Sequence, residues 1–115
     1  MDQNLGKEFL QAAEHGNAKK LQAFIADGFP VNYQDPRSQE TALHIVAACQ
    51  ARKALRVLLD TGEVDFLLRD RKGRLASEMA AVFGEDLAVA RLLRIHEKKQ
   101  GAAQGIKVTR RPSRP

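Results

Sequence analysis

Cysteine, tryptophan and long hydrophobic runs are scarce or missing in this 115-residue sequence. The single cysteine, Cys49, excludes an internal disulfide and any site built from several cysteines, and it is typical of a reducing compartment. No apolar run approaches the roughly 18 residues that a membrane-spanning helix requires. The first eight residues are polar and do not resemble a secretory signal. We therefore expect one cytoplasmic domain with a core of mainly Leu, Ile, Val and Ala, because there are only five Phe, one Tyr and no Trp.

Basic residues outnumber acidic ones, but the excess is confined to one end of the chain. The formal net charge is +5, from 19 Lys and Arg against 14 Asp and Glu. Residues 98–115 contain six of the basic residues and no acid, which leaves 13 basic against 14 acidic residues in residues 1–97. Because the C-terminal segment also lacks apolar periodicity, we predict a domain over residues 1–97 and a flexible basic tail over residues 98–115.

Similar residues recur at a shift of 34 along the chain. Phe24-Ile25 recurs as Leu58-Leu59 and again as Leu92-Leu93. A second set with this shift is Ala12-Ala13, Val46-Ala47 and Ala80-Ala81. A fixed period of this length predicts a stack of similar units. The approximate bounds of the three units are residues 5–35, 36–70 and 71–97.

Each unit is predicted to contain two short helices, because its apolar residues are spaced three and four apart. The residues that the first helices are expected to bury are Phe9, Ala12, Ala13, Leu43, Val46, Ala47, Ala76, Ala80 and Ala81. Those of the second helices are Leu21, Phe24, Ile25, Leu55, Leu58, Leu59, Val89, Leu92 and Leu93. Gly16, Gln50 and Gly84 fall between the two helices of their units, where a left-handed residue is expected. Since no unit can bury its apolar faces alone, the three are expected to form one core.

Several motifs resemble those of ankyrin repeats. Residues 41–48, with the sequence TALHIVAA, are similar to the family's TPLHxAA signature, with Ala42 in place of the usual proline. Residues 28–35, GFPVNYQD, resemble its GADVNxxD turn, and residues 70–74, DRKGR, resemble its DxxGxT entry. The resemblance covers residues 5–96 and implies an all-α solenoid of three helix-turn-helix units joined by hairpin-like turns. The first and third units lack the signature, as expected of end units whose outer faces meet water.

The resemblance also implies structural roles for the polar residues of these motifs. Thr41 is expected to cap the helix that follows it. The family histidine equivalent to His44 bridges backbone groups of adjacent loops. Asp35 and Asp70 are expected to fix their turns through Asx-type hydrogen bonds rather than to act as acids.

We expect no enzyme, because the groups that catalysis needs do not converge. His15, His44 and His96 occupy unrelated positions in the repeat, and the sequence contains no HExxH, CxxC, P-loop or glycine-rich dinucleotide motif. His44 and Cys49 are about 140° apart around one predicted helix, so they do not form a nucleophile–base pair. We therefore predict no catalytic residue, no metal site and no cofactor.

A protein-binding surface is placed on the chain by the resemblance, since ankyrin repeats usually contact partners through the turn tips and the exposed end of the first helix. The helix positions are Glu14, His15, Ala48, Cys49, Val82 and Phe83. The tip positions are Tyr33, Gln34, Arg37, Ser38, Glu40, Arg69, Arg71, Lys72 and Arg74. The second tip is strongly basic, which favours a partner protein with an acidic segment. We therefore expect a monomeric, non-catalytic scaffold for protein–protein interaction.

Three alternatives stay open at this point. Phe83 either anchors a partner or packs against the C-terminal helix as a cap. Cys49 is either exposed in the binding surface or buried, and we expect burial because cysteine usually behaves as a small apolar group. In an alternative function, the basic tail over residues 98–115 binds nucleic acid or an anionic surface, or acts as a targeting signal. It contains no aromatic residue for base stacking, so binding to nucleic acid would be non-specific.

Overall fold

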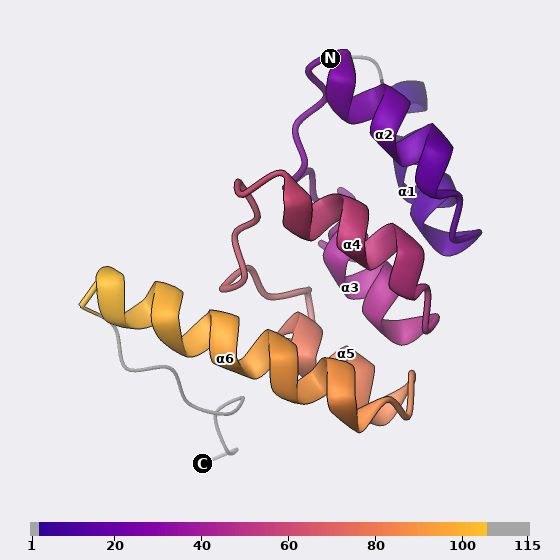
Figure 1. Cartoon of the computed structure of the whole chain (residues 1–115). Coiled ribbons are helices and arrows are strands. Elements are labelled where there is room, and N and C mark those ends of the chain that lie inside the picture. The colour runs from indigo at the N-terminus through magenta and orange to yellow at the C-terminus, as the bar shows by residue number, and fades with distance from the viewer. Residues whose placement is uncertain (1–2, 106–115) are drawn as a thin grey trace.

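Residues 3–105 are described by a computed structural model, in which six helices form two rows (Figure 1). The helices are α1 (Gln3–Glu14), α2 (Ala18–Ala26), α3 (Ala42–Ala48), α4 (Arg52–Asp60), α5 (Ala76–Val82) and α6 (Leu87–Ala103). Consecutive pairs form three units, and no strand occurs in residues 3–105. The expected all-α stack of three two-helix units is confirmed.

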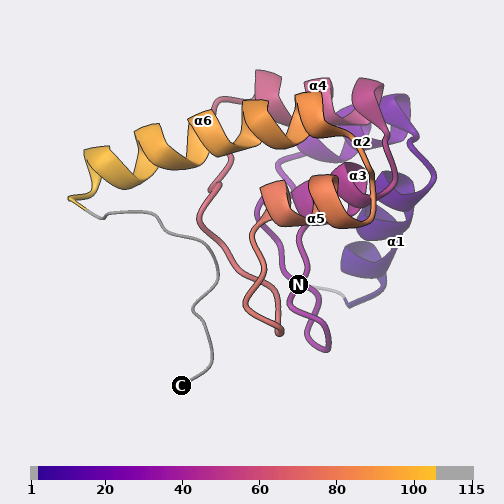
Figure 2. The same cartoon turned by 90° about the horizontal axis from the view of Figure 1, so that it is seen from below.

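Long loops join the units, and they lie on one side of the molecule. The first loop spans residues 27–41 and the second spans residues 61–75. Figure 2 shows both loops extending on the side of α1, α3 and α5, while α2, α4 and α6 form the opposite side. The first helices and the loops therefore share one surface, and the second helices make up another.

Short polar side chains start three of the helices. Asn17, Thr41 and Asp86 precede α2, α3 and α6, and each accepts a hydrogen bond from the backbone amide three residues later, at 3.1, 3.3 and 3.2 Å. Each bond satisfies one of the amides that a helix leaves unpaired in its first turn. The capping role expected of Thr41 is confirmed.

The core is continuous through the three units. Phe9, Leu21, Val46, Leu58 and Leu93 are among its most buried side chains. In the middle unit, α3 packs against both α1 and α5. The first unit adds a cluster of four of the six aromatic residues, whose ring centroids lie 4.6–5.7 Å apart in the contacting pairs; the four are Phe9, Phe24, Phe29 and Tyr33. The stack is therefore held by shared apolar burial between units rather than by separate cores.

The last helix departs from the 34-residue period, so one of the core predictions is wrong. Leu58 corresponds in burial to Leu93, a shift of 35, and Leu92 is 39% exposed. The extra residue is Glu85 in the loop before α6, where it adopts the left-handed conformation expected of Gly84 (φ 49°). One added residue turns the following helix by about 100°, which moves Leu92 toward solvent.

Other burial predictions hold with exceptions. Ala81 is exposed, because within residues 3–105 no further unit packs on α5. Three other predicted core residues are only half-buried: Phe24, Ile25 and Leu59. The left-handed conformations expected at Gly16 (φ 64°) and Gln50 (φ 58°) are confirmed.

Gly84 is required for packing rather than for a left-handed turn. A Cβ atom at this position would lie 2.4 Å from the carbonyl oxygen of Ala47 and 2.9 Å from that of Ala80. The Gln50 side chain also donates a hydrogen bond to the carbonyl of Gly84. The loop before α6 is thus pressed against the C-terminal end of α3.

The domain boundary predicted at residue 97 falls inside α6, which continues to Ala103. Gln100 holds this extension to the second loop, since its Oε1 accepts from the amide of Phe66 at 2.6 Å and its Nε2 donates to the carbonyl of Val64 at 3.0 Å. The prediction of a flexible segment is therefore wrong for residues 98–103, and residues 106–115 lie outside the described part of the chain. In residues 3–105, no helix is both long enough and apolar enough to span a membrane.

Candidate functional site

Both inter-unit loops are shaped by an aspartate that accepts local backbone hydrogen bonds. The Oδ1 atom of Asp35 accepts from the amide of Arg37 at 2.7 Å, and that of Asp70 accepts from the amides of Lys72 and Arg74 at 2.9 Å. The Asx-type role expected of both residues is confirmed. Burial tends to raise the pKa of Asp70, but the hydrogen bonds and charge of Arg74 outweigh it and lower that pKa below its usual value.

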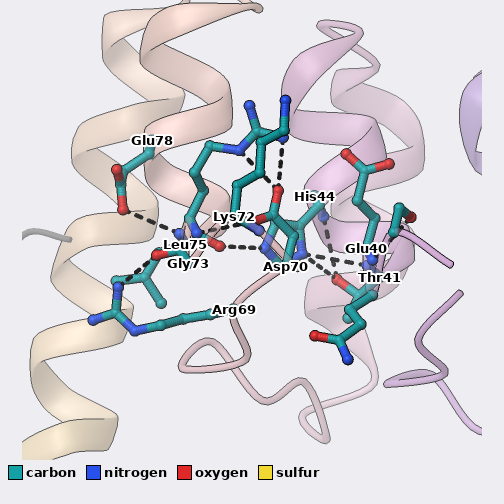
Figure 3. Close-up of polar contacts among 12 residues, drawn as sticks. Glu40, Thr41, His44, Arg69, Asp70, Lys72, Gly73, Leu75 and Glu78 are labelled. Carbon is teal, nitrogen blue, oxygen red and sulfur yellow. Dashed lines mark hydrogen bonds and ion pairs between the residues drawn. The ribbon is translucent and has the colours of Figure 1, made fainter. Parts of the chain in front are cut away.

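His44 links the start of α3 to the second loop (Figure 3). Its Nδ1 accepts from the amide of Thr41 at 3.3 Å, so the ring proton is placed on Nε2, which donates to the carbonyl of Arg74 at 2.8 Å. Burial lowers the pKa of His44, against the opposing effects of the Arg74 carbonyl and the charges of Asp70 and Glu40. The neutral ring is therefore favoured, and the bridging role that the resemblance implies is confirmed.

The two loops are also bonded directly to each other. The side-chain nitrogen of Gln34 donates to the carbonyl of Arg69 at 3.3 Å, and the amide of Arg71 donates to the carbonyl of Ser38 at 2.8 Å. Gln34 and Ser38 were predicted as contact residues, and the structure gives both a part in holding the loops together. The loop surface is thus fixed by backbone-directed bonds before any partner arrives.

The basic tip of the second loop is only partly available. Arg74 pairs with Asp70 through both Nε and Nη2, each 2.8 Å from the same oxygen, Oδ2. Its guanidinium also lies 5.2 Å from the ring centroid of Phe83. Arg69 donates to the carbonyl of Gly73 at 2.8 Å. Arg71 and Lys72 are exposed, whereas Arg69 and Arg74 are half-buried.

Phe83 and Val82 form an apolar end to the same surface. Val82 is 65% exposed and Phe83 is 53% exposed, although its ring faces the Arg74 guanidinium. The alternative in which Phe83 acts as a buried cap requires a covered ring, so the exposure favours the alternative in which it is open to a partner.

A groove of about 850 Å³ lies between α1, α3 and the first loop. Six of the residues predicted to contact a partner line it: Glu14, Tyr33, Arg37, Glu40, Ala48 and Cys49. The Tyr33 ring, which lines the groove, also packs closely on α1 at Gly6. A Cβ atom at Gly6 would lie 2.3 Å from this ring, so the close contact depends on glycine. The ends of α1 and α3 and the first loop therefore line one concavity.

Cys49 lies in this groove, and the expectation that it is buried is wrong. Its side chain is exposed because it follows the last turn of α3, where the helix no longer covers it. Partial desolvation by the groove raises the pKa of the Cys49 thiol, and the charges of Glu14 and Glu40 raise it further. The thiol form is thus favoured, which is not the state of an activated nucleophile.

Sequence reasoning missed the other half of the groove. The further lining residues are Asn4, Lys7, Leu10, Gln11, Asp35, Pro36 and Ile45. The sequence signal for the α1 wall was present, since Asn4, Lys7, Gln11 and Glu14 are spaced three and four apart and so share one helical face. His15, Val82, Phe83 and the second-loop residues do not line the groove.

No catalytic constellation is assembled in the described residues. Both ring nitrogens of His44 are engaged by backbone groups. Within residues 3–105, no group of three or more His, Cys, Asp or Glu side chains is placed to hold a metal ion. The arrangement offers shape, charge and exposed apolar area, which are the elements of recognition rather than of chemistry.

Comparison with known proteins agrees with this geometry. A family model described as ankyrin repeats, in three copies, matches residues 9–104. The matched span extends into all six helices. No curated protein is similar to the chain at a significant level.

Proposed function

The chain belongs to the ankyrin-repeat family, and from this premise we propose that it binds a partner protein without catalysis, through the groove and the adjoining loop tips. Ankyrin repeats are generally protein–protein interaction modules. The observation that carries the proposal is the concavity of about 850 Å³, which is lined by six of the contact positions that the resemblance implies. Fold alone does not name a ligand, so the surface residues must supply the specificity.

We propose that the surface binds as a rigid, preorganised unit, because hydrogen bonds already fix its loops. Helices α1 and α3 form two walls, and the first loop is closed by the bond from the amide of Asp35 to the carbonyl of Glu40, at 2.9 Å. The bonds that Gln34 and His44 make to the second loop fix the neighbouring tip. A partner therefore pays little to order this surface on binding.

The charges of the concave surface indicate which charges a complementary partner segment would carry. The groove holds two exposed or half-exposed carboxylates beside Cys49, those of Glu14 and Glu40. The second loop offers the exposed cations of Arg71 and Lys72, and Arg74 of the same loop lies 5.2 Å from the centroid of the exposed Phe83 ring. We infer a partner segment that places an apolar side chain on Phe83, acidic residues toward Arg71 and Lys72, and a basic residue toward Glu14 and Glu40.

Partner capture with matched baits tests this proposal. The baits are the full chain, Arg71→Glu/Lys72→Glu and Phe83→Ser, incubated with a nuclease-treated lysate of the source. The control is Lys98→Glu/Lys99→Glu, which makes the same charge change on α6 of the opposite surface. We expect a protein that the full chain and the control retain and that both concave-surface variants lose by tenfold or more, as for interface residues worth over about 1.4 kcal/mol. Loss with the control alone would contradict the proposal.

The alternative function, in which residues 98–115 bind an anionic target, falls partly outside the described residues. Lys98 and Lys99 belong to α6 rather than to a tail, and the last ten residues are not described. No observation favours residues 106–115 as a binding element, so this alternative, like the monomeric state and the cytoplasmic location, stays a prediction.

A further inference from the structure

Charge is divided between the two rows of helices. Helices α2, α4 and α6 together carry nine Lys or Arg and two acids, a net charge of +7. Helices α1, α3 and α5 carry one Lys and three Glu, a net charge of −2. The second-helix row, which Figure 2 shows on the side opposite the loops, is therefore strongly cationic.

The exposed face of α6 combines this charge with apolar area. Its exposed residues all fall within about 160° of the helix circumference at 100° per residue. They are Leu87, Ala88, Arg91, Leu92, Ile95, Lys98, Lys99, Ala102 and Ala103. This arc contains three large aliphatic side chains and three cations, and the one acid of the helix, Glu97, is fully buried on the opposite face. The outward face of α6 is thus basic and apolar at once.

The other second helices show that this combination is not imposed by the repeat. At a shift of 35, Leu87 corresponds to Arg52 of α4, and Ile95 corresponds to Asp60. Arg52 forms an ion pair with Asp86 at 2.8 Å, so the α4 face is polar. Helix α6 is also 17 residues long, whereas α2 and α4 have nine each. Leu87 and Ile95 are 62% and 52% exposed, so their apolar character is not needed for the core.

We propose that the outward face of α6 docks on the surface of an anionic phospholipid bilayer. Helices that lie in a membrane interface present aliphatic side chains to the acyl boundary and Lys or Arg to anionic headgroups. Arg91, Lys98 and Lys99 can extend past the aliphatic residues to reach phosphate and carboxylate groups. The remaining cations of α2 and α4 orient this side of the molecule toward the bilayer.

Other occupants fit this face less well. Nucleic acid would use the cations but gain nothing from the aliphatic residues. The exposed face of α6 carries no aromatic side chain for base stacking, because its one aromatic residue, His96, is half-buried and stacks on Phe66. A second copy related by twofold symmetry would bring the same three cations against each other. A bilayer satisfies both the charge and the apolar area.

Vesicle flotation with charge-matched variants tests this proposal. The vesicles contain phosphatidylcholine with about 30 mol% phosphatidylserine, or phosphatidylcholine alone, at about 0.1 M NaCl, where the Debye length is about 10 Å. The key variant is Leu87→Arg/Ile95→Asp, which places the α4 residues on α6 and leaves the net charge unchanged. A second variant is Lys98→Glu/Lys99→Glu. The control is Arg71→Glu/Lys72→Glu, with the same charge change on the loop side. Circular dichroism of each variant verifies the helical fold.

We expect the protein to float with the anionic vesicles and not with neutral ones. Leu87→Arg/Ile95→Asp should lower the partition coefficient at least tenfold, because two aliphatic side chains no longer leave water. Lys98→Glu/Lys99→Glu should lower it about 25-fold or more, at roughly fivefold per cation, and the control should stay within about threefold. The proposal is overturned if the protein does not float with anionic vesicles, or if Leu87→Arg/Ile95→Asp binds them like the native chain. Tighter binding to a duplex DNA or RNA oligonucleotide in the same buffer, unaffected by that double variant, would also overturn it and assign the face to nucleic acid.

Discussion

The middle and last units both consist of two helices, but different residues cap the first helix in each. In the middle unit, His44 follows Thr41 by three positions and reaches on to Arg74 in the next loop. In the last unit, Glu78 occupies the position of His44, and its carboxylate accepts from the amide of Leu75 at 3.1 Å (Figure 3). The Glu78 carboxylate caps the start of α5, but in the described part of the chain this hydrogen bond stays within its own unit. The bond back to the helix start is thus made by either residue type and caps the helix, whereas the bond from His44 to Arg74 joins the middle unit to the next.

The buried polar groups of the two units differ in the same way. The middle unit buries apolar Leu43 where the last unit has Ser77. The hydroxyl of Ser77 donates to Glu97 at 2.9 Å and its amide donates at 3.2 Å, while Arg94 lies 3.6 Å from the same carboxylate. At this position the middle unit, which packs against neighbours on both sides, uses an apolar side chain. The last unit instead joins α5 to α6 through hydrogen bonds from Ser77 to the buried carboxylate of Glu97.

The largest expected effect compares Leu58 of the middle unit with Leu92 of the last unit, which is 34 residues later but turned toward solvent. Leu58→Ala removes a fully buried side chain between neighbouring units and should lower the free energy of unfolding by about 3 kcal/mol, within the range for core leucines. Leu92→Ala should cost less than about 1 kcal/mol, because that side chain is already partly in water. Urea unfolding followed by circular dichroism measures both. We expect a single transition in each case, and separate transitions would show that the units do not share one core. Equal losses would show that Leu92 is as buried as Leu58 and contradict the turned register of α6.

The second comparison concerns two glycines. Gly84→Ala should destabilise the fold by about 2 kcal/mol, because the new Cβ meets backbone of α3 and α5 that cannot move freely. Gly62→Ala is the control, since its φ of 68° is unfavourable for alanine but no atom lies within 4 Å of the new Cβ. That control should cost about 1 kcal/mol. Equal losses in thermal or urea unfolding would mean that α3 does not constrain the loop before α6.

Two buried titratable groups, Glu97 in the last unit and His44 in the middle unit, make stability depend on pH in opposite directions. Burial raises the pKa of Glu97 above its ordinary value of 4.5, against the hydrogen bonds of Ser77 and the charge of Arg94. The folded state therefore holds this proton more tightly, so the contribution of Glu97 to stability is complete below pH 4.5 and is lost as pH rises through the raised pKa. His44 has a lowered pKa, so its contribution is complete above pH 6.5 and is lost as pH falls.

Glu97→Gln tests the prediction that the contribution of Glu97 to the stability of the last unit is lost as pH rises. The variant keeps an acceptor for Ser77 and removes the charge. We expect its stability relative to the native chain to improve by about 1 kcal/mol between pH 4 and pH 8, the order of the cost of a buried polar group. Glu63→Gln, on the exposed second loop, is the control for loss of a carboxylate. A relative stability that falls as pH rises would show that the Glu97 charge stabilises the unit.

The smallest expected change in stability is at Phe83. Phe83→Ser should lower the free energy of unfolding by less than about 1 kcal/mol, since the ring is half exposed and its contact with Arg74 is worth about that at an exposed site. Phe9→Ala, in the core of the first unit, should cost about 3–5 kcal/mol for comparison. A loss near 3 kcal/mol at Phe83 would identify it as a structural cap rather than a contact residue.

Sequence periodicity was sufficient for the architecture and for most of the core. The shift of 34 located Leu58, Val46 and the left-handed Gln50, because stacking forces equivalent residues into equivalent environments. It failed at α6, where Glu85 adds one residue to a short loop and turns the helix. A period found by matching apolar pairs cannot detect that change, since Leu92 and Leu93 are the same residue type.

The site was less predictable because its properties depend on contacts across the fold. The sequence counts Arg74 as a free cation, but Asp70 and Phe83 hold it. Cysteine frequencies predicted burial of Cys49, but its position at the end of α3 leaves it exposed. Glu97 was counted in the domain without a role, and its burial against Ser77 could not be inferred from spacing. Charge and burial at single positions therefore required the structure.

The central claim, that the groove receives a partner protein, is tested most directly by crosslinking from Cys49. This is the one cysteine of the chain, and it lies in the groove. A photoreactive maleimide is attached at about pH 8.5, near the ordinary pKa of a thiol, because the raised pKa keeps this thiol protonated at neutral pH. The control, Cys49→Ser/Ala23→Cys, moves the probe to the exposed side of α2. We predict a specific crosslinked protein from Cys49 that is absent from the control and is reduced tenfold by Arg71→Glu/Lys72→Glu. The same protein crosslinked equally from both positions, or from Ala23→Cys alone, would contradict the claim.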